Sequence, residues 1–186
     1  MSVELELPDD AGRAGLQARG YRPEREVLRM VGSLSEPLSL PARPAGVGIR
    51  TWREGDGRRV HAVLVEAYAT GRELVPPYEE WLPWLTGDAE FDPALCFLAE
   101  AGGELAGVCQ CWTSAFVKDL AVLPSFRGRG IGEALLRTAF AELRSRGATT
   151  VALGVDAENP TGAIRLYERL GMRVERRLEL WTSEAS

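Results

Sequence analysis

The chain has 186 residues, of which 45% are hydrophobic and 26% are charged, as in ordinary globular proteins. Its formal net charge of -5 disfavours a nucleic-acid-binding role, which usually needs a basic face. No apolar run approaches the roughly 20 residues of a membrane span, and the acidic residues between Glu4 and Asp10 argue against a signal peptide. We therefore expect a cytoplasmic protein with one ordinary domain and an extension.

The cysteines and the histidine favour a structural role over a metal site. Cys96, Cys109 and Cys111 form no Cys-x-x-Cys pair, and each lies in an apolar, strand-like context. That pattern favours reduced, buried thiols. Because His61 is the single histidine, neither a zinc site nor a Ser-His-Asp triad is expected.

The first 36 residues predict a strand, a short helix and a charged strand. The two strands are expected at residues 3–7 and 24–31, and the helix is expected to end near Gly20. Residues 37–46 are rich in proline, serine and glycine, which is a linker composition.

From residue 47 on, apolar periodicity and breaker residues predict the order β-α-α-β-β-β-α-β-α-β. Gly102-Gly103 predicts a tight hairpin turn, and Asn159-Pro160 predicts a helix N-cap followed by proline. This order predicts an α/β fold with a mixed sheet and helices on both faces. The expected ranges are 47–52, 58–69, 78–85, 94–100, 105–112, 116–123, 131–146, 149–155, 160–170 and 174–181.

The most informative segment is Arg127-Gly128-Arg129-Gly130-Ile131-Gly132, between a strand and a helix. Free N–H groups and the positive dipole end of a helix favour an anion such as a phosphate. The segment lacks the lysine of a P-loop and the Gly-x-Gly-x-x-Gly spacing of a dinucleotide site. It therefore indicates a different pyrophosphate cradle, the alternative being a glycine-rich turn with exposed arginines.

The motifs and their order resemble the GNAT superfamily of acyl-CoA-dependent N-acyltransferases over residues 47–181. Arg127-x-x-Gly130-x-Gly132 is similar to the family's signature loop, and Asp119 to Pro124 is similar to the strand before it. Asn159-Pro160 and residues 166–172 are similar to the second signature helix and the start of the next strand. The resemblance implies a mostly antiparallel central sheet flanked by helices.

The resemblance implies acetyl-CoA as the acyl donor. In the family, loop N–H groups hold the coenzyme A pyrophosphate, and the strand before the loop pairs with pantetheine. A strand N–H, that of Val122, would polarise the thioester carbonyl. Asn159 matches a position that often contacts the cofactor, the alternative being a simple N-cap. The implied cofactor-binding residues are Leu120, Ala121, Val122, Arg127, Gly128, Arg129, Gly130, Ile131, Gly132 and Asn159.

Tyr167 matches the family's tyrosine that protonates the departing thiolate. A phenol with a pKa near 10 can donate to a thiolate whose conjugate acid has a pKa near 8.5. The alternative is a core aromatic residue, since helical spacing places Tyr167 beside Ala163 and Ile164.

The general base is open. Several family members use a glutamate on the strand before the loop, but the inward positions here are Phe116 and Lys118. Strict alternation predicts that Asp119 points to the other face. A water chain to bulk solvent is another possibility. The remaining candidates, each also explained as a surface group, are His61, Glu66, Glu79 and Glu80.

The acceptor site is expected on the first two helices, whose aromatic residues are suited to bind a cationic amine or to pack in the core. These residues are Tyr68, Tyr78, Trp81 and Trp84. The function implied is transfer of acetyl to a primary amine of a small molecule or peptide by direct attack in a ternary complex. The alternative is a catalytically weak acyl-CoA-binding module with a sensory or structural role.

Residues 1–36 resemble the C-terminal part of the same fold in element order and size. Tandem GNAT proteins, mycothiol synthase-like ones among them, have two copies joined by a comparable linker. We therefore expect a relic half-domain at 1–36, a linker at 37–46 and the acetyltransferase domain at 47–186, the alternative being an unrelated extension. Because a half-domain cannot bury its own sheet face, packing on the catalytic domain or homodimerisation is expected.

Overall fold

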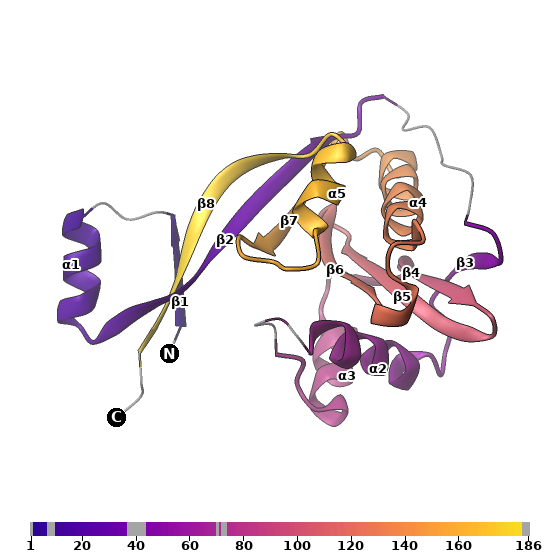
Figure 1. Ribbon diagram of the computed structural model, residues 1–186, viewed down its shortest axis with the longest axis horizontal. Helices are drawn as coiled ribbons and strands as arrows, with labels where there is room; N and C mark the ends of the chain where they lie inside the picture. The colour runs from indigo at the N-terminus through magenta and orange to yellow at the C-terminus, as the bar shows by residue number, and fades with distance from the viewer. Residues whose placement is uncertain (1, 7–9, 37–43, 70, 72–73, 184–186) are drawn as a thin grey trace. The chain divides into compact units, whose positions relative to one another are not determined.

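The structure is a computed structural model that describes residues 2–6, 10–36, 44–69, 71 and 74–183. The chain forms two compact units, Ser33–Val151 and the combination of Met1–Gly32 with Ala152–Ser186 (Figure 1). The expected linker at 37–46 lies mostly outside the described residues, and the domain boundaries expected from the sequence stay predictions.

The larger unit is an antiparallel sheet in the order β6-β5-β4-β3 (Figure 1). Gly102 and Gly103 both have positive φ and form the tight turn between β4 and β5, as expected. The elements are β3 (Val47–Thr51), α2 (Gly57–Tyr68), α3 (Tyr78–Gly87), β4 (Phe91–Ala101), β5 (Glu104–Trp112), β6 (Phe116–Val122), the short 3-10 helix η1 (Pro124–Phe126) and α4 (Ile131–Ser145).

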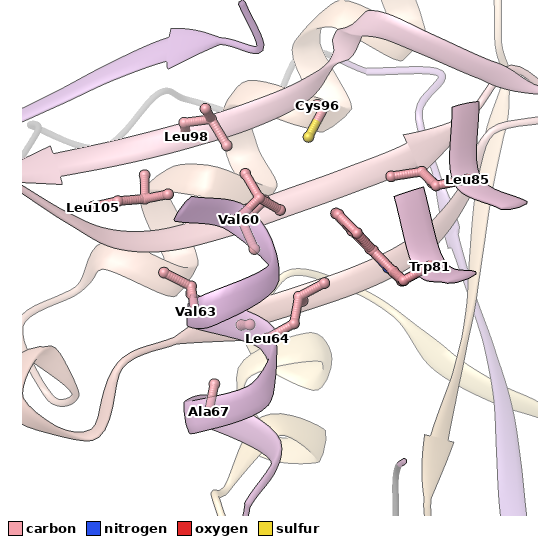
Figure 2. Packing of buried hydrophobic residues seen from close by; sticks show 11 residues of the cluster. Val60, Val63, Leu64, Ala67, Trp81, Leu85, Cys96, Leu98 and Leu105 are labelled. Atoms are coloured by element: carbon pink, nitrogen blue, oxygen red, sulfur yellow. The ribbon is translucent and has the colours of Figure 1, made fainter. Parts of the chain in front are cut away.

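Helices α2 and α3 cover one face of this sheet. The apolar stripe of α2, Val60, Val63 and Leu64, packs in one cluster with Trp81 of α3 and Leu98 of β4 (Figure 2). Helix α4 covers the opposite face, where its Leu135 approaches Gly107 of β5. The core therefore has two layers, one on each face of the sheet that contains β6.

The smaller unit contains β1 (Ser2–Glu6), α1 (Asp10–Ala18), β2 (Tyr21–Ser33), β7 (Thr150–Asp156), α5 (Ala163–Arg169) and β8 (Arg173–Ser183). Its strands follow the order β1-β8-β2-β7, with β8 antiparallel to both β1 and β2. Each strand-helix-strand segment thus inserts its last strand between the two strands of the other. This symmetry is what a relic half-domain at 1–36 requires, and that origin stays a hypothesis.

The predicted element order from residue 47 is confirmed, strand for strand and helix for helix. The predicted cap at Asn159 is wrong: α5 begins at Ala163 after Gly162, which is left-handed at φ 79°. The Asn159 Oδ1 instead accepts hydrogen bonds from the backbone N–H and the hydroxyl of Thr161, at 2.9 and 2.5 Å. Short asparagine side chains readily close such local turns, which compete with capping.

None of the helices in the described residues is long and apolar enough to cross a membrane.

An ion-pair network fixes the start of α2 to the sheet. Arg50 of β3 donates to both Asp56 carboxylate oxygens, at 2.6 and 2.9 Å, and to Glu100 of β4 at 2.9 Å. The backbone N–H of Arg53 also donates to Asp56, at 2.7 Å. The hydrogen bonds from Arg50 lower the pKa of the Asp56 carboxyl below its usual value.

Asp56→Asn is expected to lower the free energy of unfolding by about 1.5–3 kcal/mol at neutral pH, because charge-assisted hydrogen bonds are lost. A carboxyl whose folded pKa is lowered stabilises the fold above its ordinary pKa, near 4, and loses that contribution as pH falls through the lower folded value. The difference between wild type and variant should therefore be constant above about pH 5 and shrink below about pH 4. Urea unfolding across pH measures it, and a pH-independent difference would contradict the ion-pair account.

Gly107→Ala is expected to lower the free energy of unfolding by about 1–3 kcal/mol, as overpacking does. A Cβ at this position would lie 2.8 Å from the backbone oxygen of Ala121 and 3.3 Å from Leu135. Gly48→Ala on β3 is the matched control, because its Cβ would meet nothing within 4 Å. Equal stability of the two variants in urea unfolding would refute the close approach of β5 and β6.

Candidate acyl donor and acceptor site

The glycine-rich segment joins β6 and η1 to α4. Gly128 and Gly130 have φ values of 75° and 78°, a left-handed conformation that strains any residue with a side chain. Gly130, which has no side chain, is the N-cap of α4, and no side-chain cap hydrogen bond is found there among the residues that the structure describes. The first-turn N–H groups of α4 thus lack that kind of cap, and their binding of an anion stays a prediction.

The side chain of Arg127 braces this segment. Its Nε donates to the backbone oxygen of Val122 at 3.1 Å, and its Nη2 donates to that of Ala67 at 2.9 Å. The guanidinium thus joins the end of β6 to the last turn of α2, where a cation also offsets the helix dipole. The Arg129 guanidinium lies over the Phe126 ring at 5.0 Å.

The backbone of β6 alternates in direction, as in any antiparallel pair. The N–H of Leu123 donates to Ala106 of β5 at 2.9 Å. Hydrogen-bonding direction alternates along an antiparallel strand. The N–H and C=O groups of Val122 and Leu120 therefore point away from β5. The bond from Arg127 to the Val122 oxygen agrees with that direction. Ala121 faces β5 between them.

A register shift in β6 changes the faces expected for its side chains. Gln110 pairs with Asp119, whereas the next residue, Cys111, pairs with Val117, so Lys118 is an extra residue. The prediction that Asp119 points to the other face is wrong. The bulge breaks strict alternation and places Phe116 and Asp119 on the face that α2 and α3 cover.

Asp119 is a buried carboxylate, 8% exposed, at the edge of the apolar cluster. It accepts a hydrogen bond from the Tyr68 hydroxyl of α2 at 3.1 Å and one from Lys118 Nζ at 3.0 Å. Lys118 Nζ also lies 5.4 Å from the ring centre of Trp84 on α3. Asp119, Tyr68, Lys118 and Trp84 therefore form a cluster. No sequence motif predicts it, because it depends on the pairing of β5 with β6.

Gln110 lies beside this cluster and is 1% exposed. Its amide nitrogen and oxygen make no hydrogen bond within the described part of the chain. Cys96, Gln110 and Asp119 are aligned across β4, β5 and β6. Burial raises the pKa of the Cys96 thiol, and the Asp119 carboxylate raises it further, so this thiol is neutral.

The three cysteines are buried and free, which confirms the expectation of buried thiols.

The remaining base candidates on α2 and α3 are distributed over the surface. Glu66, Glu79 and Glu80 are exposed, and Glu79 lies 3.6 Å from Arg58. His61 Nε2 is 2.8 Å from the backbone oxygen of Pro76. These positions favour the structural interpretation of all four.

Of the aromatic residues expected at an acceptor site, some lie in the core and others at the surface. Trp81 is buried in the cluster of Figure 2, where it packs beside His61, Tyr78 and Trp52. Trp84 is 54% exposed and touches Trp112 edge-on. Trp84 is thus the aromatic residue of α3 that is open to a ligand beside Lys118.

Tyr167 and Asn159 belong to the smaller unit. Tyr167 lies in α5 and is 6% exposed, and its backbone oxygen accepts from the N–H of Met172 at 3.0 Å. Asn159 lies in the exposed turn before α5. Their roles toward a ligand stay predictions.

Known proteins resemble the chain in sequence and fold. Mycothiol acetyltransferase of Thermobispora bispora is 37% identical over 165 residues, which are 82% of this chain and 55% of that protein. A crystal structure of a GCN5-related N-acetyltransferase from Sphaerobacter thermophilus has a TM-score of 0.81 and 32% identity, covering 97% of this chain and 59% of that chain.

A tandem GNAT protein from the clavulanic acid biosynthesis pathway has a TM-score of 0.70 at 20% identity, covering 100% of this chain and 63% of that chain, and shows the shared fold alone. The chain spans about half the length of the mycothiol acetyltransferases that it matches. The model of the acetyltransferase (GNAT) family matches residues 58–172. The chain therefore belongs to the GNAT acetyltransferase family.

Proposed function

We propose that the protein is an N-acetyltransferase that moves an acetyl group from acetyl-CoA to a primary amine by direct attack in a ternary complex. The observation that carries the proposal is the uncapped start of α4 behind Gly128 and Gly130, in a chain of this family. GNAT acetyltransferases in general use acetyl-CoA as donor. Direct attack needs donor and amine bound together, so that proximity supplies part of the barrier reduction.

The donor binds along β6 and the segment after it. N–H groups of residues 127–132 hold the pyrophosphate, where the helix dipole favours negative charge. Leu120 and Val122 turn backbone groups away from β5, so pantetheine pairs with them as a strand would, with Ala121 between them. The N–H of Val122 polarises the thioester carbonyl.

Tyr167 supplies the proton for the leaving group. Coenzyme A departs more readily as a thiol than as a thiolate, and a phenol is a suitable acid for that step. Asn159 contacts the cofactor from the turn before α5. These two roles rest on the family's motif.

The acceptor is a small-molecule or peptide amine that reaches α2 and α3. The exposed ring of Trp84 and the carboxylate of Asp119 support an amine that carries positive charge before it reacts. Because similar proteins are named mycothiol acetyltransferase, an amine related to mycothiol is the first acceptor to test. In this proposal residues 1–36 correspond to the C-terminal part of another copy of the fold, and the protein is cytoplasmic and forms a homodimer.

The second candidate is an acyl-CoA-binding module with little turnover. It is favoured by Phe116 and Lys118, which the sequence gives as the inward positions of the strand on which several family members have a glutamate. A panel of amines that includes amino sugars, aminothiols and peptides separates the two. Release of coenzyme A thiol with at least one amine supports the enzyme, whereas acetyl-CoA binding without turnover supports the module.

Tyr167→Phe is expected to lower kcat by about 100-fold or more, the usual contribution of general acid catalysis. Acetyl-CoA affinity should change little, because the hydroxyl acts when the thiolate leaves. Steady-state kinetics with the best amine of the panel measures both. Unchanged kcat would leave Tyr167 as a core aromatic residue.

Arg127→Lys is expected to weaken acetyl-CoA binding by about tenfold, because an ammonium cannot reproduce the planar fork that reaches two carbonyl oxygens. Arg144→Lys is the matched control, since it makes the same substitution, without a change of charge, at an exposed position in the last turn of α4. Calorimetric titration with acetyl-CoA compares the two. Equal affinities would contradict the brace.

A further inference from the structure

A buried polar row crosses the face of the sheet beneath α2 and α3. Gln110 and Asp119 lie opposite each other on β5 and β6, and Gln110 has no hydrogen-bond partner within the residues that the structure describes. Leaving a buried amide unpaired costs about 1–3 kcal/mol. A buried polar group without a partner points to one that arrives with a ligand or water.

Lys118 is the single lysine of the chain. Its Nζ lies 3.0 Å from Asp119 Oδ2 and 5.4 Å from the ring centre of Trp84. A carboxylate and the face of an indole are two groups that bind a primary ammonium strongly. The side chain of Lys118 thus fills a site that suits an acceptor amine.

The place of this site on β6 follows from the donor path, and so the inference rests on the proposed function. With the pyrophosphate at residues 127–132 and pantetheine beside Val122 and Leu120, the acyl end continues toward the start of β6. The next residues in that direction are Asp119 and Lys118. At about 3.3 Å per residue, Asp119 and Lys118 lie about 10 and 13 Å along the strand from Val122, so the long side chain of Lys118 would have to extend along β6 to meet the thioester.

We propose that Asp119 is the carboxylate that holds the acceptor ammonium, and that Lys118, its resident occupant, is itself acetylated by acetyl-CoA. The Lys118 ammonium gives one proton to Asp119, and its nitrogen lone pair attacks the thioester carbonyl carbon. The C–N bond forms and the C–S bond breaks, and the sulfur leaves with the electron pair. Tyr167 gives its proton to that sulfur, as in the proposed function, and the second proton of the nitrogen restores the Tyr167 hydroxyl, giving the amide and coenzyme A thiol.

The acetylated side chain no longer carries the charge that pairs with Asp119. Asp119 releases the proton it received to solvent, and its carboxylate, hydrogen-bonded to Tyr68, is then open to an incoming amine. Trp84 is exposed beside it and offers that amine its aromatic face. The same two groups therefore serve the resident lysine and the external acceptor in turn.

The test follows acetylation of the full chain by acetyl-CoA with peptide-mapping mass spectrometry. The N-terminal amine of the same molecule is the internal reference, because its pKa near 8 makes it the more reactive amine in simple chemical acetylation. Lys118 is expected to acquire acetyl at least about tenfold faster than that reference, since an acting base contributes about 100-fold or more. An equal or slower rate at Lys118 overturns the proposal without any variant.

Three variants sharpen the test. Asp119→Asn is expected to slow acetylation of Lys118 by about 100-fold, whereas Asp92→Asn, which removes a carboxylate paired with Arg146, should retain the wild-type rate. Lys118→Arg should leave only the reference amine acetylated. A wild-type rate in Asp119→Asn overturns the role of Asp119, and thermal unfolding of each variant confirms that it is folded.

Calorimetric titration of the wild-type protein with acetyl-CoA distinguishes failure of this inference from failure of the proposed function. Binding without acetylation of Lys118 overturns this inference and leaves the proposed function standing. Absence of binding overturns both. Binding with rapid acetylation of Lys118 supports both.

Discussion

The geometry at the end of β6 depends on the left-handed backbone of Gly128 and Gly130. Two positive φ angles turn the chain sharply, and within the described residues no side-chain cap hydrogen bond closes the start of α4. Arg127 holds this turn to α2 and β6 through two backbone oxygens. Arg127 therefore acts here through its side chain as a brace. The backbone of its neighbours is what we propose to bind the anion.

The turn at the glycines, the start of α4 and the element order could be predicted from local sequence signals. Glycines between a strand and an amphipathic helix predict both the turn and the direction of the helix N-terminus, and the element order from residue 47 follows from periodicity. The position of Asp119 did not follow, because a bulge depends on the register between β5 and β6. The brace of Arg127 did not follow either, since its partner Ala67 is 60 residues away.

The polar row beneath α2 and α3 consists of Gln110 and Asp119. Burying polar groups in an apolar layer is unfavourable for stability but suits a binding site. An apolar face would accept leucine at residues 110 and 119 at no desolvation cost, whereas Gln110 and Asp119 need partners. Asp119 has Tyr68 and Lys118, and Gln110 is unsatisfied within the described residues. Such locally unfavourable choices are expected where function constrains the sequence.

The segment after β6 is proposed to bind the donor's pyrophosphate. A crystal structure of the protein with acetyl-CoA tests it most directly. The account predicts phosphate oxygens within hydrogen-bond distance of the N–H groups of residues 128–132, and pantetheine beside Leu120 and Val122. A pyrophosphate bound elsewhere on the chain would contradict the account.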